Sequence, residues 1–453
     1  MKRKDHKNGN IPDIDGNHPD IIIEGGTLMT MAEGPASIRP ASIFIKKDKI
    51  VDIKTADDRY QIPSGAEIID ARNGIIMPGL INAHSHTAMT IFRGLADDLP
   101  LKQWLYDHIF PAESKHLNPE TVYWGTLLGC LEMIASGTTS FIEGYFFQDN
   151  TVKATHRSGL RALIAQGIID FPAPGVSDPL KNLQVGKEFI EKWLGYSDRI
   201  TPGLFCHSPL TCSDKTLKGA MEISQDFSLP LQIHLSETSE EVKKILKKTG
   251  QRPVHYLEGL GLLNHHLIAA HAIHLNNEEI ELLSQEGVKV VHVPESNMKM
   301  SSGVARISDM LRMGMIVGLG TDGCASNNNM DLFQEMDSAA KLGKVFTLDP
   351  VILDAETVLK MVTIGGAKIM GLEKEIGTIE IGKKADIIVI DLQSPHLVPL
   401  YNPMSTMVYS ANGADVKDVI VNGQVLMKDR TFQTLNPDEI FEKITAISRE
   451  IRN

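Results

Sequence analysis

The chain has 453 residues, 42% of them hydrophobic and 23% charged, a composition that suits one large barrel with a smaller domain and excludes a disordered or fibrous protein. Its formal net charge of −12 opposes attraction to nucleic acid and to anionic membranes, so we expect neither as a partner. Scattered cysteines without a Cys-x-x-Cys pair, and no apolar run of about 20 residues, predict a cytoplasmic protein. We expect its partner to be a small molecule.

Both ends of the chain have a β character. Residues 1–19 are polar and charged, and we interpret them as a flexible tail without the apolar segment of a signal peptide. Residues 20–73 then show short strand-like runs separated by turns, and the same pattern returns in residues 375–430, where Asn422-Gly423 predicts a hairpin turn. We predict one small β-sandwich domain built from both chain ends, with two unrelated β appendages as the alternative, and a C-terminal helix in residues 431–453.

The middle of the chain, residues 74–374, alternates strand-like apolar runs with helical stretches. The runs are Ile75–Ala83, Thr139–Ile142, Arg161–Ala165, Pro202–Cys206, Leu231–His234, Leu267–His271, Val288–His292 and Ile316–Gly320. Eight β/α units are the content of a TIM barrel, in which functional residues gather at the C-terminal ends of the strands. We therefore predict an α/β fold, a (β/α)8 TIM barrel joined to the small β domain.

The first barrel run ends in a His-x-His pair, His84 and His86. Residues two apart on a strand point to the same side, so both imidazoles can reach one ion. Alone, such a pair fits a metal site and a solvated strand face about equally well. Because His234 and Asp322 lie at other strand ends, we predict that these four residues hold one divalent ion and leave a coordination position open for water.

Two further strand ends carry candidate proton-transfer groups. Glu237 could carry a proton to a ring nitrogen, although an acidic residue there would also suit the start of a helix. His271 could orient or deprotonate the activated water. His292 fits an ordinary loop histidine better than a ligand, and we leave it out of the site.

Sequence motifs around these residues point to a family. The motifs are Pro78-Gly-Leu-Ile-Asn-Ala-His-Ser-His, Phe92-Arg-Gly-Leu-Ala-Asp-Asp-Leu-Pro-Leu, Ser136-Gly-Thr-Thr, His234-Leu-Ser-Glu, Ala270-His-Ala-Ile-His-Leu, Glu295-Ser-Asn-Met-Lys, Gly320-Thr-Asp-Gly and Gly382-Lys-Lys-Ala-Asp-Ile. Together they resemble the amidohydrolase superfamily, in its branch of 5'-methylthioadenosine/S-adenosylhomocysteine deaminases and triazine hydrolases. The resemblance runs from Asp20 to Gln424 and implies the same four metal ligands and the same proton-transfer pair.

The resemblance implies hydrolytic deamination of an aromatic ring. Water activated by one zinc ion, with iron as the alternative, attacks the carbon that bears the amine. Glu237 protonates the adjacent ring nitrogen, and His271 with Asp322 carries a proton from the water to the departing ammonia. We expect adenosine-type nucleosides as substrates: 5'-methylthioadenosine, S-adenosylhomocysteine, adenosine or 5'-deoxyadenosine. We also expect a homo-oligomer.

Two other functions stay open from the sequence. One is a hydrolase of the same fold that displaces another ring substituent, such as chloride or alkylamine from a triazine, or that deaminates guanine-like or pterin-like rings. The other is a catalytically silent barrel that only binds a partner, which the intact ligand set and Glu237 disfavour.

Three more positions match the adenosine-type deaminases: Trp104, Glu113 and His207. The resemblance implies that they line the nucleoside pocket, where the Glu113 carboxylate is suited to accept two ribose hydroxyl hydrogen bonds. From the residues alone, Trp104 equally fits the buried side of an amphipathic helix, and Glu113 fits a solvated loop.

The chain departs from the family pattern after the third barrel strand. Some deaminases carry arginines there that meet a distal carboxylate of the substrate, but residues 163–174 of this chain contain none. Lys181 could replace them only as a point charge. This disfavours S-adenosylhomocysteine relative to methylthioadenosine or adenosine. The fourth strand has no lysine placed to bridge two metals as a carbamate, so we expect a mononuclear site.

Overall fold

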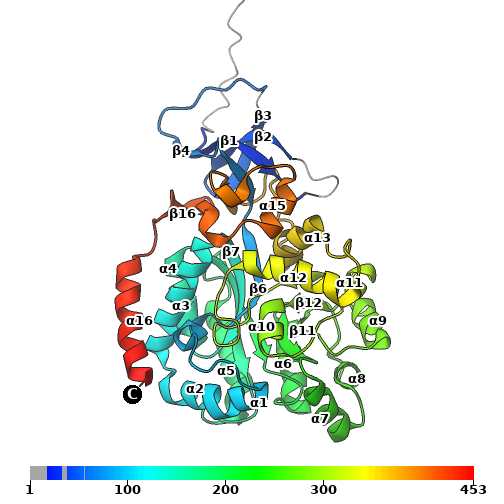
Figure 1. Ribbon diagram of the computed structural model, residues 1–453. Coiled ribbons are helices and arrows are strands. Elements are labelled where there is room, and N and C mark those ends of the chain that lie inside the picture. Colours follow the sequence, from blue (N-terminus) through cyan, green and yellow to red (C-terminus); the bar gives the residue numbers. More distant parts are fainter. Residues whose placement is uncertain (1–17, 33–37, 56, 453) are drawn as a thin grey trace, which may run out of the picture.

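The structure is a computed structural model that describes residues 18–32, 38–55 and 57–452. It contains a nine-stranded sheet at one end and an eight-stranded barrel surrounded by helices (Figure 1). The predicted flexible tail, residues 1–19, lies outside the described residues except for its last two positions.

The nine-stranded sheet is assembled from both ends of the chain. Its strands are β1 Ile21–Met29, β2 Ile38–Lys46, β3 Lys49–Thr55, β4 Glu67–Asp70, β5 Gly74–Pro78, β14 Ile387–Asp391, β15 Val416–Val421, β16 Gln424–Lys428 and β17 Thr431–Phe432. They follow the order β17-β16-β15-β14-β5-β1-β2-β3, with β4 paired to β1. The two halves meet where β5 pairs with β14 in an antiparallel register. The alternative of two unrelated β appendages was therefore wrong.

The predicted hairpin turn at Asn422-Gly423 is confirmed. It joins β15 to β16, and both turn residues have a positive φ, 52° and 73°. Such angles are those of the tight turn whose twist matches a hairpin. A Cβ on Gly423 would lie 1.8 Å from the carbonyl oxygen of Lys47, so only glycine allows this close approach.

The eight barrel strands lie side by side and parallel, in chain order. They are β6 Leu80–Ser85, β7 Thr138–Tyr145, β8 Arg161–Ile168, β9 Ile200–Cys206, β10 Leu231–Leu235, β11 Leu267–His271, β12 Lys289–His292 and β13 Val317–Leu319. An isolated parallel bridge between Ser85 and Asp322 joins the two ends of this sheet. The predicted (β/α)8 TIM barrel is thus confirmed.

The first apolar run, Ile75–Ala83, differs from the prediction because it is two strands and not one. The chain changes sheets at Gly79, so that β5 pairs with β1 and β14 while β6 begins the barrel. A Cβ on Gly79 would lie 2.1 Å from the side chain of Thr139, which leaves no room for a larger residue. The limits of the two domains stay a prediction, although β5 belongs to the nine-stranded sheet.

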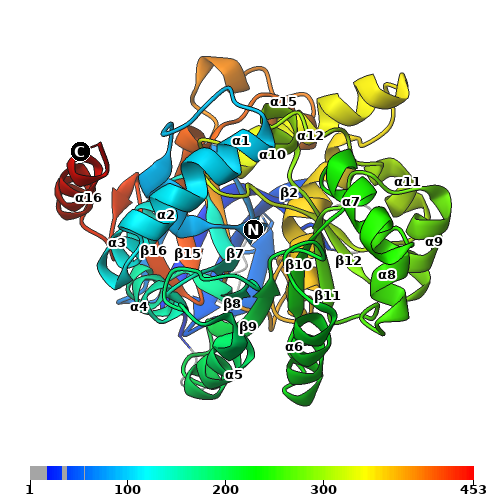
Figure 2. The same cartoon turned by 90° about the horizontal axis from the view of Figure 1, so that it is seen from below.

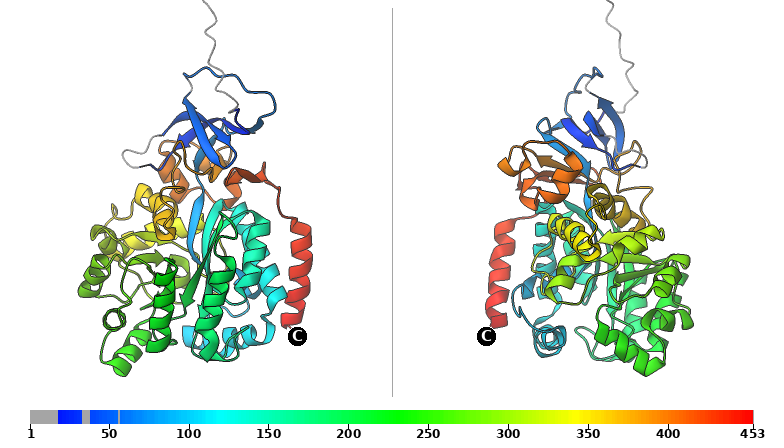
Figure 3. Two further views of the ribbon diagram at one scale, coloured as in Figure 1. Left: turned by 180° about the vertical axis from the view of Figure 1, so that it is seen from behind. Right: turned by 45° about the vertical axis from the view of Figure 1, so that its right-hand side comes forward.

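Helices cover the barrel and flank its strand ends. The α-helices are α1 Leu101–Gln103, α2 Phe110–His116, α3 Pro119–Ala135, α4 Gln148–Ser158, α5 Asn182–Trp193, α6 Asp214–Asp226, α7 Ser239–Thr249, α8 Pro253–Gly259, α9 Asn277–Gln285, α10 Pro294–Lys299, α11 Ile307–Arg312, α12 Leu332–Thr347, α13 Ala355–Lys360, α14 Gly366–Met370, α15 Pro403–Tyr409 and α16 Pro437–Arg452. Shorter helical turns include η1 Thr87–Phe92, η2 Trp104–Ile109, η3 Pro179–Lys181 and η4 Met361–Gly365. The terminal helix α16 runs along the outside of the barrel beside α3 (Figure 3).

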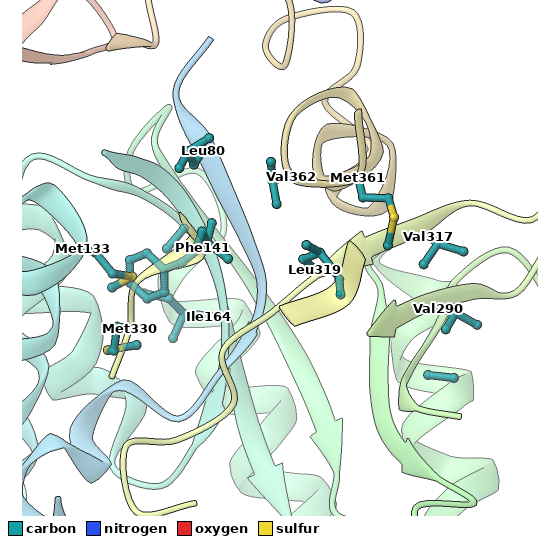
Figure 4. Packing of buried hydrophobic residues seen from close by; sticks show 14 of the residues in the cluster. Leu80, Met133, Phe141, Ile164, Val290, Val317, Leu319, Met330, Met361 and Val362 are labelled. Atoms are coloured by element: carbon teal, nitrogen blue, oxygen red, sulfur yellow. The ribbon is translucent and has the colours of Figure 1, made fainter. Parts of the chain in front are cut away.

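An apolar core holds the barrel strands and helices together. Phe141 of β7 and Met133 of α3 are fully buried in this core, as are Leu80 at the start of β6 and Leu319 in β13 (Figure 4). Burial of each large apolar side chain stabilises the fold by about 1.5–3 kcal/mol. Because β6 starts directly after the nine-stranded sheet, the parallel strands end on the opposite side, next to α1, α2 and α7 (Figure 2).

Candidate functional site

The four predicted metal ligands come together at the carboxyl ends of the barrel strands. His84, His86, His234 and Asp322 each offer one ligand atom, and these atoms all lie within 4.8 Å of one another. Nε2 of His84 is 3.2 Å from Nε2 of His234, and Nε2 of His86 is 3.2 Å from Oδ1 of Asp322. Two imidazole nitrogens this close need a proton or a cation between them. Three imidazoles and one carboxylate are a donor set that fits a zinc-type divalent ion.

Hydrogen bonds outside the cluster orient two of these side chains. Nδ1 of His86 donates to the carbonyl oxygen of Gly144 at 2.5 Å, which leaves the lone pair on Nε2 for the cluster. Oδ2 of Asp322 accepts from the hydroxyls of Ser296 at 2.6 Å and Ser326 at 3.0 Å, which directs Oδ1 to the histidines. Such outer partners fix ring orientation and raise ligand basicity.

The backbone is strained or crowded at several site positions. Asp322 has a φ of 58° and His271 a φ of 69°, in the left-handed region that non-glycine residues rarely adopt. Each such residue costs about 1–3 kcal/mol and persists only where the surrounding structure enforces it. A Cβ on Gly320 would lie 2.7 Å from the backbone nitrogen of His84, so the glycine lets the end of β13 approach β6 closely.

Burial keeps most of the clustered imidazoles neutral. It lowers the pKa of His84 to about 4, and together with the neighbouring histidines it lowers the pKa of His234 well below the ordinary value. Burial also opposes the charge on His86, but the Asp322 carboxylate raises its pKa to about 9. Burial likewise opposes ionisation of Asp322, but His84 and His86 hold its pKa well below its usual range. A bound divalent cation would replace the proton that His86 and Asp322 otherwise share.

The predicted proton-transfer pair lies beside this cluster. Nε2 of His271 is 3.9 Å from Oε2 of Glu237, and both residues line the same cavity. Nδ1 of His271 is 2.9 Å from Oδ1 of Asn297, which turns Nε2 inward, while the hydroxyl of Ser302 donates to Oε1 of Glu237 at 3.3 Å. Glu237 directly precedes Thr238, the N-cap of α7, so it lies at the start of this helix as well as beside the cluster, and the two roles can coexist.

The cavity extends from the cluster as a largely apolar pocket. It encloses about 820 Å³ including space open to solvent, and Trp104, Glu113 and His207 all line it. Much of the remaining wall is aliphatic or aromatic, contributed by Leu101, Leu105, Ile109, Phe110, Phe146, Ile168, Ile169 and Met300. Among the described residues that line the pocket, none is lysine or arginine. Lys181 is exposed and lies outside this lining, so the geometry does not support it as a substitute for the missing arginine.

Glu113 is a buried helical residue, so the solvated-loop alternative was wrong. It belongs to α2, is 4% exposed, and accepts a hydrogen bond of 2.5 Å from the Tyr145 hydroxyl. Burial raises the pKa of Glu113 to about 7, although Tyr145 and His86 lower it in part. Trp104 in η2 is also buried, and its indole N–H has no partner within the described part of the chain. Nδ1 of His207 lies 2.9 Å from the Thr211 hydroxyl.

Glu143 and Tyr145 are site residues that the sequence analysis missed. Both lie at the carboxyl end of β7, directly after the run Thr139–Ile142 that the sequence marked as a strand. The rule that strand ends carry function in a TIM barrel would have singled them out. Ser296 and Asn297 were quoted only as part of a motif, and their contacts with Asp322 and His271 follow from the fold.

A TIM barrel that gathers three histidines, an aspartate and a Glu–His pair at its strand ends defines a metal-dependent hydrolase. Residues 75–426 match the Amidohydrolase family. The chain therefore belongs to the amidohydrolase family, and it is an enzyme.

Two curated relatives extend over nearly the whole chain. The 5-methylthioadenosine/S-adenosylhomocysteine deaminase 1 of Syntrophus aciditrophicus is 45% identical over 433 residues, which cover 96% of this chain and 98% of that protein. The 5'-deoxyadenosine deaminase of Methanosarcina mazei is 43% identical over 95% of this chain and 98% of its own length.

Solved structures show the same fold. An adenosine deaminase from Xanthomonas campestris with bound zinc has a TM-score of 0.93 and 35% identity, covering 96% of this chain and 99% of its own. A zinc complex of atrazine chlorohydrolase from Arthrobacter aurescens has a TM-score of 0.87 and 23% identity, covering 94% of this chain and 100% of its own, a likeness of fold. Across the described residues, no helix combines the length and apolar character needed to cross a bilayer.

Proposed function

We propose that this enzyme deaminates adenosine-type nucleosides hydrolytically, releasing ammonia and the inosine-type product. One observation carries the proposal: His86, His234 and Asp322 of the cluster, the Glu237–His271 pair and the buried Glu113 all line one cavity. The cavity thus offers groups for water activation, for proton transfer and for a ribose. The names of the relatives, 5-methylthioadenosine/S-adenosylhomocysteine deaminase and 5'-deoxyadenosine deaminase, support the same substrate class.

The proposed metal ligands are His84, His86, His234 and Asp322, holding one zinc ion, with iron as the alternative. Three imidazoles and a single carboxylate suit zinc, and related barrels contain it. When bound, the ion would lower the pKa of a water molecule and so supply a nucleophile at neutral pH.

The chain's own residues move the protons in this proposal. Glu237 protonates the ring nitrogen next to the carbon under attack, which allows that carbon to become tetrahedral. His271, whose Nδ1 is held by Asn297, uses Nε2 to take a proton from the attacking water. With Asp322 it passes a proton to the departing amine. The second proton of the water returns to Glu237 as the water oxygen becomes the keto oxygen, and the amine leaves as ammonia.

The pocket wall determines which 5' substituents fit. We propose that Glu113 accepts the ribose hydroxyls, with Tyr145 holding one of its oxygens and the other left to the ligand. The apolar wall and the absence of lysine and arginine among the described lining residues favour small uncharged 5' groups. We therefore expect 5'-methylthioadenosine and 5'-deoxyadenosine to be better substrates than S-adenosylhomocysteine, whose carboxylate would find no arginine and only the lysines of the adjoining pocket, Lys102, Lys244 and Lys299.

A substrate panel tests the proposed function. Ammonia release is measured with 5'-methylthioadenosine, 5'-deoxyadenosine, adenosine, S-adenosylhomocysteine, guanine and a chlorotriazine, using zinc-loaded protein. The proposal requires the highest kcat/KM with one of the nucleosides. Turnover of guanine or triazine alone would favour the other ring hydrolases. Stoichiometric metal without any turnover of the panel would also contradict the proposal.

Replacement of Glu113 by Gln is expected to raise KM for nucleosides by about 10- to 100-fold, because a hydrogen bond to a charged acceptor contributes about 1.5–3 kcal/mol. We expect kcat to change little, since Glu113 does not face the reacting carbon in the proposed complex. Steady-state kinetics check this result. The matched control is 2',3'-dideoxyadenosine, which lacks the ribose hydroxyls and should not distinguish the variant from the wild type. An unchanged KM for adenosine would exclude the ribose role.

The ionisation of Glu113 also predicts a pH dependence. Its pKa is raised to about 7, mainly by burial, and the ionised form is the better acceptor for two hydroxyls. Below that pH the carboxyl must lose its proton before the nucleoside binds, so kcat/KM should fall by up to about tenfold per pH unit and level off above it. Profiles of zinc-saturated wild type and Glu113→Gln are compared. If kcat/KM fell in the same way at low pH in the wild type and in Glu113→Gln, this assignment would be contradicted.

We further propose a cytoplasmic, homo-oligomeric enzyme. All four cysteines are free thiols, which suits a reducing compartment. Light scattering coupled to size-exclusion chromatography measures the assembly state; a monomer at micromolar concentration would contradict the oligomer.

A further inference from the structure

Glu143 is a buried carboxylate that the proposed ligand set and the proton-transfer pair do not use. It lies on β7 and has no solvent exposure. One of its oxygens, Oε2, accepts three hydrogen bonds: from the backbone N–H of Thr87 at 2.7 Å, from the Ser85 hydroxyl at 2.9 Å, and from the Thr87 hydroxyl. All three donors belong to the short segment that carries the His-x-His pair.

These donors lie on both sides of His86 in the chain. Ser85 lies between the two histidines and is the register partner of Glu143 across the β6–β7 pair, and Thr87 follows His86 directly. The next residue of β7, Gly144, accepts the hydrogen bond from Nδ1 of His86. The end of β7 therefore holds the backbone on both sides of His86 and also the ring itself. These contacts are needed because β6 ends at Ser85, and beyond it the hydrogen bonds between barrel strands no longer restrain the chain.

The cost of burying Glu143 argues against a purely structural role. Its second oxygen, Oε1, is buried without a hydrogen-bond partner, and the described residues give it no lysine or arginine ion pair. Burying a carboxylate with one oxygen unpartnered costs several kcal/mol, and an apolar residue of similar size would pack at this position at lower cost. The divalent ion expected between the nearby ligands would offset part of this cost.

We propose that Glu143 is a positioning residue of the metal centre, fixing the His84–Ser85–His86 segment through Ser85 and Thr87 so that both imidazoles are preorganised for the ion. The inference rests on the proposed ligand set and is independent of which nucleoside is the substrate. Preorganised ligands bind metal more tightly because less ordering is needed on binding.

The test measures zinc affinity by competition with a chromophoric chelator, in the full-length protein. We expect Glu143→Ala and Glu143→Asp to weaken zinc binding by about 10- to 100-fold, the range found when partners of metal ligands are removed. Aspartate keeps the charge but is too short to reach all three donors. Glu143→Gln keeps the length and an acceptor oxygen, so it should lose less affinity than the other two. The visible spectrum of the cobalt-substituted variants should change with the altered ligand geometry.

The matched control is Glu279→Gln. Glu279 is a fully buried glutamate that pairs with Arg252 and caps α9, and it belongs neither to the four-residue cluster nor to the lining of the cavity. We expect it to lower the melting temperature without weakening zinc binding. Wild-type zinc affinity in both Glu143→Ala and Glu143→Asp would overturn the inference, and if Glu143→Ala does not fold, Glu143→Asp decides alone. Failure of the wild type to bind zinc would instead contradict the proposed ligand set, so the two failures are distinguishable.

Discussion

Substitution of Glu237 by Gln is expected to lower kcat for nucleoside deamination by about 10²–10⁴-fold, the usual contribution of a positioned general acid. Glutamine has nearly the same size and can keep the hydrogen bond from Ser302, but it cannot deliver a proton to the ring nitrogen. We expect KM and zinc content to stay close to the wild-type values. Steady-state kinetics together with metal analysis of the purified variant check this expectation.

The neighbouring residue Glu240 supplies the matched control. It lies one turn further on, in the first turn of α7, where its exposed side chain pairs with Lys244. Glu240→Gln changes the same functional group on a residue outside the lining of the proposed catalytic cavity, and kcat should stay within about twofold of the wild type. If Glu237→Gln retained full activity, or lost activity together with its zinc, Glu237 would not be the proton donor.

Loss of the metal ion is the second large effect. Removal of zinc by a chelator, or substitution of His234 by Ala, should reduce activity by about 10³-fold or more, because several kcal/mol of transition-state stabilisation depend on the ion. Zinc added back should restore the chelated wild type but not His234→Ala, which lacks one of the imidazoles that approach each other within 3.2 Å. Activity and bound zinc are measured on the same samples.

His292 tests whether this effect is specific to the four proposed ligands. It is another buried histidine, at the end of β12, but it is not a member of the four-residue cluster. Burial lowers its pKa to about 3, so it is a neutral side chain at physiological pH. His292→Ala should therefore retain stoichiometric zinc. Zinc loss in this variant, or full activity of the metal-free wild type, would contradict the proposed centre.

The sequence alone predicted the barrel and the four clustered residues for a physical reason. Parallel strands in a closed barrel end on one face, so unusual residues at separate strand ends must meet there. Strand periodicity predicted that the side chains of His84 and His86 point to the same side. His234 and Asp322 were included in the site because they lie at other strand ends. The split at Gly79 was missed because an uninterrupted apolar run does not reveal which sheet each half joins.

What the sequence by itself determined is therefore the alternation of strands and helices and the residue types at the strand ends, since both depend on short-range periodicity. Only the tertiary structure decided that Glu113 is buried against Tyr145, that Glu143 accepts hydrogen bonds from the residues on both sides of His86, and that the pocket wall is apolar. Those facts depend on contacts between segments far apart in the chain, whose partners and burial are fixed only when the barrel closes.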